Sequence, residues 1–251
     1  MTRALRRGII EVPNSSEAHA ALALLNTRLM RIESMRLAPS DAPLDETTRA
    51  LFVRYGAAIL SMPDLATPAA EALGTGLEYG ELQLSLESLC QWLRLLKIMP
   101  RRIFCLADLD SQILGRALAY QLNIEFEVTN GDGYTHSKSL IVTADNRALL
   151  AAPLRTIFPA QVLYSLNLHR EGGAIAPDVA GMSRAGLLFP WRDERLTTRK
   201  IATIAERIVN APAPMNSDNW QSRLEFYRAR RDLLTAGNSC YSRLSMLPES
   251  L

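Results

Sequence analysis

The stretch RIFCLADLDSQILGRALAYQLNIEFEV, residues 102–128, has the pattern of a strand, a helix and a second strand. Residues 102–106 form an apolar run, and residues 111–122 carry apolar side chains at helical spacing. Residues 124–128 predict the next strand. A strand, a helix and a strand in this order are typical of a parallel sheet covered by helices.

Two aspartates, Asp108 and Asp110, stand between the first predicted strand and the helix. In open α/β sheets ligands bind in the loops that follow the carboxyl ends of the strands, so both side chains are candidates for contact with a ligand or a metal. The simpler alternative is that Asp110 or Ser111 only caps the helix, which stabilises it by about 0.5–2 kcal/mol. Both interpretations fit the sequence.

The same alternation continues toward the C-terminus. Strands are predicted over residues 139–143, 161–168 and 186–191, and a short helix over residues 147–157. The dipeptide at residues 177–178 predicts a loop. Buried apolar strands that alternate with helices are typical of a mostly parallel sheet with helices on its faces. This part of the chain therefore predicts an α/β fold.

Helical segments flank the α/β region and divide the chain into three expected parts. Residues 1–75 are predicted to form a mainly helical N-terminal region, residues 76–195 the α/β domain, and residues 196–251 a helical C-terminal extension. Helices are predicted over residues 14–37, 45–62, 82–96, 197–209 and 218–234. The apolar faces of the two flanking parts fit either the core or a second subunit, so a protein partner or a homo-oligomer stays open.

Composition narrows the class of protein. With 251 residues, 48% of them hydrophobic and 22% charged, the chain is long enough for one main core with helical additions. A formal net charge of +2 gives no signal for nucleic acid, and no apolar stretch is long enough to span a membrane. Cys90, Cys105 and Cys240 are widely spaced and odd in number, which predicts free thiols in a reducing compartment, the cytoplasm.

The order of segments across residues 77–191 resembles that of a known family. The helix YGELQLSLESLCQWLRLLK is followed by RRIFCLADLDSQILGRALAYQLN, IEFEV, TNGDGYTHSK and SLIVTADNRALLAAP, and then by PDVAG and LLFPW. This order is similar to that of type I phosphoribosyltransferases, in particular the small purine-using branch. The resemblance implies a pyrophosphate loop after the first strand, a mobile loop that contains Lys138, and a phosphate-binding loop over residues 143–149.

The resemblance also implies a set of site residues, and some of these differ from the residues that are usual in the family. Asp145 would coordinate the sugar hydroxyls through Mg²⁺, and substrate contacts would come from Asp108, Asp110, Ser111, Thr143, Asn146, Arg147, Lys138 and Trp191. The family ends this strand in two acids and a Thr-Gly turn, whereas VTADNRAL keeps one acid and no glycine. Two aspartates in the pyrophosphate loop would each cost about 4 kcal/mol against an anion at about 4 Å.

These departures favour a degenerate phosphoribosyltransferase-like protein that binds a phosphorylated small molecule or regulates a partner. A divergent transferase that uses phosphoribosyl diphosphate and Mg²⁺ is the enzymatic alternative. Asp108-Leu109-Asp110 also resembles the nucleophile motif of haloacid-dehalogenase-like phosphatases, with Asp108 and Asp110 around Mg²⁺ and Thr143 as a second motif. No cofactor is certain, and Mg²⁺ would serve both enzymatic alternatives. His169, at the end of a strand, is expected on the surface.

Overall fold

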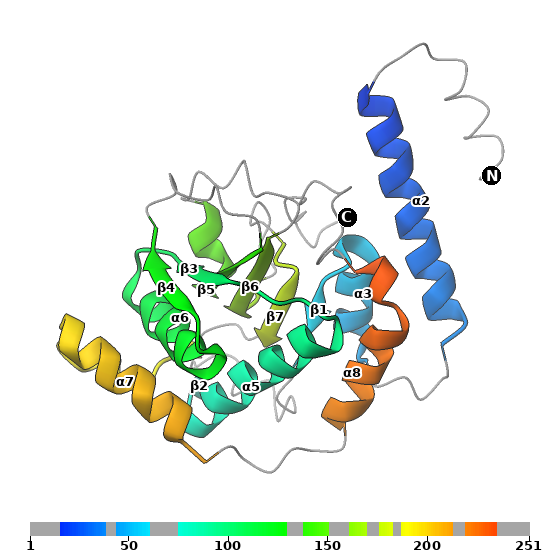
Figure 1. The fold of residues 1–251 in the computed structure, drawn as a ribbon. Helices are drawn as coiled ribbons and strands as arrows, with labels where there is room; N and C mark the ends of the chain where they lie inside the picture. Colours follow the sequence, from blue (N-terminus) through cyan, green and yellow to red (C-terminus); the bar gives the residue numbers. More distant parts are fainter. Residues whose placement is uncertain are drawn as a thin grey trace.

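The structure, a computed structural model, describes residues 16–38, 44–60, 75–129, 138–150, 161–169, 176–182, 187–212 and 219–234. Its centre is a six-stranded sheet in the order β1-β7-β6-β5-β3-β4, in which every described strand pair is parallel (Figure 1). The predicted α/β fold with a mostly parallel sheet is therefore confirmed.

The strands are short apolar runs. They are β1 (Ala58–Ile59), β3 (Arg102–Cys105), β4 (Glu125–Val128), β5 (Ser139–Asp145), β6 (Val162–Asn167) and β7 (Val179–Met182). Two further strands, β2 (Thr75–Gly76) and β8 (Leu187–Leu188), pair with each other outside the main sheet. The inner strands β5, β6 and β7 are buried almost throughout, as expected for strands covered on both faces.

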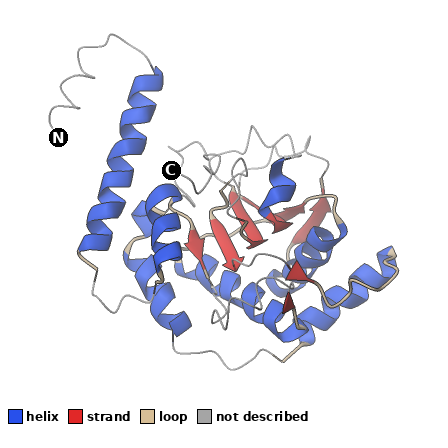
Figure 2. Ribbon diagram, turned by 180° about the vertical axis from the view of Figure 1, so that it is seen from behind, coloured by secondary structure: helices blue, strands red, loops and turns tan. Residues whose placement is uncertain are grey.

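Helices cover the sheet and extend beyond it, as Figures 1 and 2 show. They are α2 (Ser16–Arg36), α3 (Glu46–Tyr55), α5 (Tyr79–Leu95), α6 (Leu109–Leu122), α7 (Thr198–Asn210) and α8 (Asn219–Ala229), with the short 3-10 helices η1 (Asn146–Leu150) and η3 (Arg231–Leu233). Helices α5 and α6 pack on the sheet, and α7 packs against both. The largest apolar core lies here, because these helices turn their apolar stripes toward the strands.

The connection of the strands fixes where a ligand could bind. From β3 the chain passes through α6 to β4 on one side, whereas β5 pairs with β3 on its other side. The order β4-β3-β5-β6-β7 thus changes direction between β3 and β5, and such a switch point is the usual position of the binding crevice in an open α/β sheet. The turns after β3 and β5 therefore border the expected binding crevice.

The predicted helix over residues 45–62 is wrong in its second half. Helix α3 ends at Tyr55, because Gly56 adopts the left-handed conformation with φ 68° and its N–H donates to the carbonyl of Phe52. Ala58 and Ile59 then form β1, which pairs with β7. The region expected to be only helical therefore supplies a strand to the sheet, while the division into three parts stays a prediction.

The loop predicted at residues 177–178 is present, but the sequence did not predict the strand that follows it: Val179–Met182 forms β7 between β6 and β1. A Cβ at Gly181 would collide with Ser85 Oγ and would lie 2.7 Å from Tyr164 Oη. The strand therefore needs a glycine where α5 crosses it closely. That glycine interrupts the β-branched pattern by which a strand is recognised in sequence.

Two other segments differ in extent from the prediction. The helix expected over residues 147–157 is the 3-10 helix η1 at its start, and residues 151–157 lie outside the described part of the chain. The helix expected over residues 218–234 is α8 followed by η3. Among the described helices none is long and apolar enough to cross a lipid bilayer.

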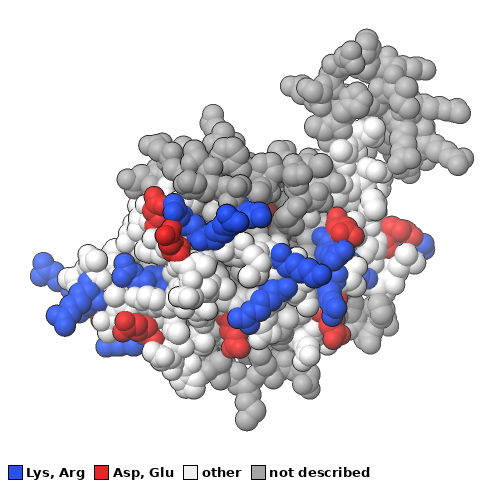
Figure 3. All heavy atoms as spheres, viewed as in Figure 1, with Lys and Arg blue, Asp and Glu red and all other residues white. Residues whose placement is uncertain are grey.

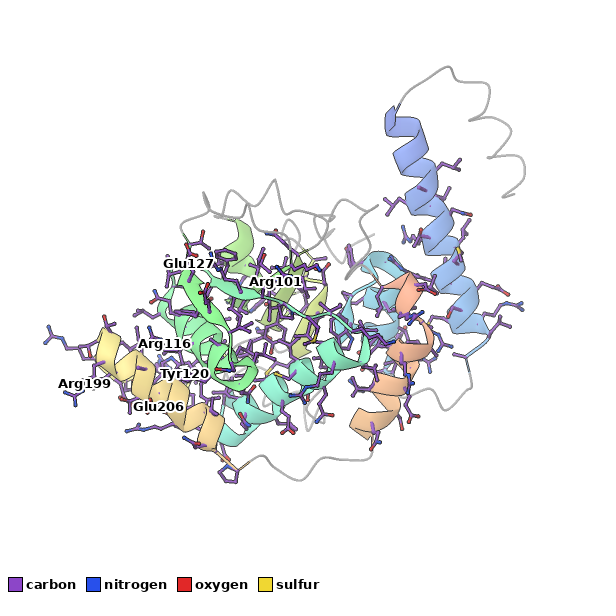
Figure 4. All side chains as sticks on the ribbon, in the orientation of Figure 1. Arg101, Arg116, Tyr120, Glu127, Arg199 and Glu206 are labelled. Atoms are coloured by element: carbon purple, nitrogen blue, oxygen red, sulfur yellow. The ribbon has the colours of Figure 1, made fainter. Side chains whose placement is uncertain are left out.

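The edge strand β4 is bordered by charged side chains. Arg102 on β3 pairs with Glu125 at 2.6 Å and with Glu127 at 3.4 Å. Arg116 on α6 lies over the ring of Phe126, 5.4 Å from its centroid, and Figure 4 shows Arg116 and Glu127 at this side of the molecule. Charges on an edge strand disfavour pairing with another strand, so this edge is protected.

Candidate functional site

The turns after β3 and β5 are joined by Ser111, which is fully buried. Its Oγ accepts a hydrogen bond from the backbone N–H of Ala144 at 2.9 Å and lies 3.4 Å from Thr143 Oγ1, to which it donates. Because β3 and β5 are parallel neighbours, their carboxyl ends meet at one edge of the sheet. The structure thus brings together the two loops that the sequence singled out.

In the turn after β3, Asp108 caps helix α6. Its carboxylate accepts a hydrogen bond from the N–H of Ser111 at 2.8 Å, and its backbone is extended, as an N-cap residue requires. The sequence pointed to Asp110 or Ser111 as the cap, but the helix begins earlier, at Leu109. Asp108 therefore has the capping role that was considered for its neighbours.

Asp110 lies in the first turn of α6 and accepts a hydrogen bond from Trp191 Nε1 at 2.7 Å. Burial raises the pKa of Asp110, the Trp191 hydrogen bond opposes that rise, and the charge of Asp108 adds to it. Trp191 is only 1% exposed and stacks on Phe189, with ring centroids 4.8 Å apart. This contact fastens the segment after β8 to the start of α6.

Asp145, the last residue of β5, lies beside two basic side chains. Its Oδ1 accepts hydrogen bonds from the backbone N–H of Arg147 at 2.8 Å and from Arg147 Nε at 3.1 Å, and its Oδ2 accepts from Arg147 Nη2 at 3.0 Å. His169 Nε2 lies 3.0 Å from the same Oδ2. One carboxylate thus caps η1 and faces two side chains that can carry positive charge.

His169 is held in place by Asn146. The side-chain Nδ2 of Asn146 donates to the carbonyl of His169 at 3.1 Å, and its Oδ1 accepts the His169 N–H at 2.7 Å. His169 is only 6% exposed, so it is not the surface histidine that its position at a strand end suggested. No local sequence signal marks it, because its partner Asp145 lies on the neighbouring strand β5.

Thr143 and Asn146 are fully buried parts of the frame of this site. Thr143 Oγ1 donates to the carbonyl of Asp145 at 2.9 Å and accepts from Ser111. Arg147 is different, because half of its side chain is exposed. Of the residues expected to bind substrate after β5, Arg147 is therefore the one that presents a charged group to solvent.

Lys138 is not brought to this edge. It directly precedes β5, its φ is 68°, and its carbonyl accepts a hydrogen bond from Arg101 N–H at 2.9 Å. Asp145 is at the far end of β5, which runs about 20 Å from Ser139 at roughly 3.3 Å per residue. The loop over residues 130–137, which the resemblance treats as mobile, lies outside the described residues.

The site as it stands does not fit a Mg²⁺ ion. Both carboxylate oxygens of Asp145 face basic groups, which compete with a cation for them. Within the described ranges no group of three or more His, Cys, Asp or Glu side chains lies close enough to hold a metal. The arrangement can instead bind an anion, if a ligand displaces Asp145 from Arg147.

Charge on the visible surface is mixed in sign. Figure 3 shows basic and acidic side chains interspersed over the described part of one face, with no extended area of a single sign. The chain as a whole carries a formal net charge of +2. A net charge this small gives a weak overall field, so any preference for an anion at the site comes mainly from local groups.

Comparison with known proteins gives similarity to solved structures only. No family model matches, and a search of curated proteins finds no match. A purine phosphoribosyltransferase from Pyrococcus horikoshii is 16% identical, with a TM-score of 0.39 over 49% of this chain and 97% of that one. The xanthine-guanine-hypoxanthine phosphoribosyltransferase of Helicobacter pylori is 17% identical, with a TM-score of 0.33 over 42% and 87%.

A third similar structure is that of a hypothetical protein from Neisseria gonorrhoeae with bound ppGpp. It is 14% identical, with a TM-score of 0.38 over 53% of this chain and 97% of that one. Two of these three structures are purine phosphoribosyltransferases, the family that the sequence resembles. Likeness at this level supports no conclusion about function, so function is inferred from the residues of this chain.

Proposed function

We propose that this chain is a phosphoribosyltransferase-like protein that does not transfer a phosphoribosyl group and that acts as a binding or regulatory module for a phosphorylated small molecule. One observation carries the proposal. Each acidic side chain of the two turns already binds a group of the same chain: Asp108 the N–H of Ser111, Asp110 the indole of Trp191, and Asp145 the guanidinium of Arg147.

Phosphoribosyl transfer would require Asp145 to hold the ribose hydroxyls through Mg²⁺. The carboxylate would first have to release Arg147, and the guanidinium that remained beside it would repel the incoming cation. The backbone of the same turn is also occupied, because the N–H of Arg147 donates to Asp145 at 2.8 Å. Both features favour a protein that has lost the transfer reaction.

The ligand class follows from the groups that remain. Arg147 is half-exposed, and its planar guanidinium suits a phosphate oxygen pair. His169 lies on the other side of Asp145, 3.0 Å from the carboxylate. A phosphate bound at this edge would have to replace the Asp145 carboxylate as the partner of Arg147. We therefore expect weak binding, which a substitution of Asp145 can change.

Calorimetry with phosphoribosyl diphosphate and Mg²⁺, together with an assay of pyrophosphate release in the presence of purine bases, tests this proposal. We expect no release of pyrophosphate, and binding that Asp145→Asn does not weaken. Glu125→Gln is the matched control, because it removes one surface charge at the start of β4, at the other end of the strands. Tight Mg²⁺-dependent binding that Asp145→Asn abolishes would establish the active transferase instead.

The phosphatase alternative has no contact in its favour. Its nucleophile would be Asp108, whose carboxylate holds the start of α6, and its acid would be Asp110, which is hydrogen-bonded to Trp191. Thr143 is fully buried. Hydrolysis of p-nitrophenyl phosphate that depends on Mg²⁺ and disappears in Asp108→Asn would restore this alternative.

We also propose a cytoplasmic location. Cys90 and Cys105 are buried free thiols, and burial raises the pKa of Cys90 to about 11 and that of Cys105 to about 12. Thiols of this kind are unreactive and behave as small apolar side chains. They favour a reducing compartment, and location by a fluorescent fusion tests this expectation.

A further inference from the structure

Helix α2 stands out from the α/β body, and Figures 1 and 2 both show its first half clear of the described elements. Its 21 residues have the length of three heptads. The C-terminal half contacts α3 and η3. There Arg31 Nε donates to the carbonyl of Leu233 at 2.7 Å, and Ser34 Oγ accepts from Arg230 Nε at 2.6 Å. One side of the helix is thus fixed to the body.

A second side of α2 carries an apolar stripe that points away from the body. Its members recur at intervals of three, four and three residues, which is the spacing of a coiled-coil seam: Leu22, Leu25, Leu29 and Ile32. Leu25 is 37% exposed and Ile32 is 46% exposed. In this heptad Arg31 and Ser34 take the outer positions, opposite the seam. The body and the stripe therefore occupy different sides of one helix.

We propose that the stripe packs against the same stripe of a second copy of this chain, in a parallel two-stranded coiled coil. Charge complementarity identifies this occupant. With the stripe at the a and d positions, Arg28 falls at g and Glu33 at e, and both are exposed. In a parallel pair a g residue meets the e residue five positions later on the partner helix, so Arg28 of each chain meets Glu33 of the other.

The same charges disfavour the opposite orientation. In an antiparallel pair g faces g, so with Leu25 aligned against Leu29 of the partner helix Arg28 would lie against Arg28 and would have no acidic partner. Within one chain Glu33 pairs with Arg36 at 2.8 Å, but both side chains are more than half exposed. A surface pair of this kind contributes little, so Glu33 can turn to the partner at small cost. The two bodies, attached at the outer positions, lie on opposite sides of the coiled coil.

The mass of the full chain in solution tests the proposal by light scattering or analytical ultracentrifugation at micromolar concentration. We expect twice the 27.8 kDa of one chain. The double variant Leu25→Asp/Ile32→Asp removes the seam and should have the mass of one chain. Met30→Asp is the control, because Met30 is 55% exposed on the same helix but lies outside the stripe. A wild-type mass of one chain, or a double variant that keeps twice that mass, overturns the proposal.

Reversal of charge tests the parallel pairing and leaves the apolar stripe intact. Arg28→Glu and Glu33→Arg each bring like charges together, so each alone should dissociate at a concentration at least tenfold above that of the wild type. Mixed, they should associate as tightly as the wild type, because both cross-chain pairs are then of opposite sign. If the mixture associates no better than the separate variants, the proposal is overturned. Circular dichroism confirms that each variant is folded.

Discussion

The turns after β3 and β5 use the same local device in different electrostatic surroundings. In the first, Asp108 accepts the N–H of Ser111, and in the second Asp145 accepts the N–H of Arg147, each at 2.8 Å. The first turn adds Asp110, which is bound by the neutral indole of Trp191. The second adds the guanidinium of Arg147. The first turn therefore contributes to packing, whereas the second keeps charged groups at the surface.

This difference bears on function because an anionic ligand needs a basic side chain whose present acidic partner it can replace. Burial raises the pKa of Asp110, and the Trp191 hydrogen bond holds this carboxyl group inside a packed contact. At the second turn the Arg147 side chain is half-exposed, and its partner Asp145 can be displaced.

The largest loss of stability should follow Trp191→Ala. Trp191 is almost fully buried between Phe189 and the start of α6, so its removal leaves a cavity and should lower the free energy of unfolding by about 3–5 kcal/mol. Arg147→Ala, at the second turn, should lower it by about 1 kcal/mol or less. Urea denaturation followed by circular dichroism measures both. Equal losses would mean that the two turns do not differ in packing.

Ser111→Ala should cost less than Trp191→Ala, about 1–3 kcal/mol, because the buried N–H of Ala144 would lose its acceptor. The same substitution removes the hydrogen bond between the two turns. The Ala144 amide should therefore be less protected from hydrogen exchange in the variant than in the wild type. A variant of unchanged stability with an unchanged Ala144 exchange rate would show that Ser111 does not join the turns.

Asp108→Ala should lower the free energy of unfolding by about 0.5–2 kcal/mol, since α6 loses its N-cap. Asp108→Asn should be nearly neutral, because asparagine caps a helix as well as aspartate does. Thermal unfolding of both variants beside the wild type measures the difference. If Asp108→Asn lost as much stability as Asp108→Ala, the negative charge of Asp108 and not its N-cap hydrogen bond would account for the loss.

The smallest effect on stability is the pH dependence contributed by Asp110. Its pKa is raised in the folded state, so the folded protein binds more protons than the unfolded chain between the ordinary aspartate pKa of about 3.9 and the raised value. This contribution is therefore most favourable below that window and is lost as the pH rises through it. Relative to Asp110→Asn, the wild type should lose stability across the window in urea titrations. A relative gain would contradict the raised pKa.

The sequence predicted the parts of the fold that depend on local pattern. Helices α5 and α6 and strands β3 and β5 lie where the periodicity of apolar residues placed them. The sequence missed β7, because Gly181 is required by the crossing of α5 and not by the strand itself. It likewise extended α3 past Gly56, whose left-handed backbone ends the helix. Both errors arise where tertiary contact or one backbone angle overrides the pattern.

The position of the site could be predicted from the sequence, but the contacts of its side chains could not. The rule that ligands bind after parallel strands directed attention to Asp108 and Asp110, the family resemblance pointed to Asp145, and the structure brings the two turns together. The partners of the acids could not be read from local sequence, since Trp191 is 81 residues from Asp110, and His169 lies on the neighbouring strand end. Such contacts depend on the order of strands in the sheet, which no local pattern encodes.

We infer that the carboxylate of Asp145 neutralises the basic side chains of the second turn, Arg147 and His169. Calorimetric titration of inorganic pyrophosphate without Mg²⁺ into the wild type and Asp145→Asn tests it most directly, because asparagine can still accept the N–H of Arg147 while the negative charge is gone. We predict that the variant binds pyrophosphate more tightly, on the order of tenfold or about 1.4 kcal/mol. Binding that is unchanged or weaker in Asp145→Asn would contradict the account.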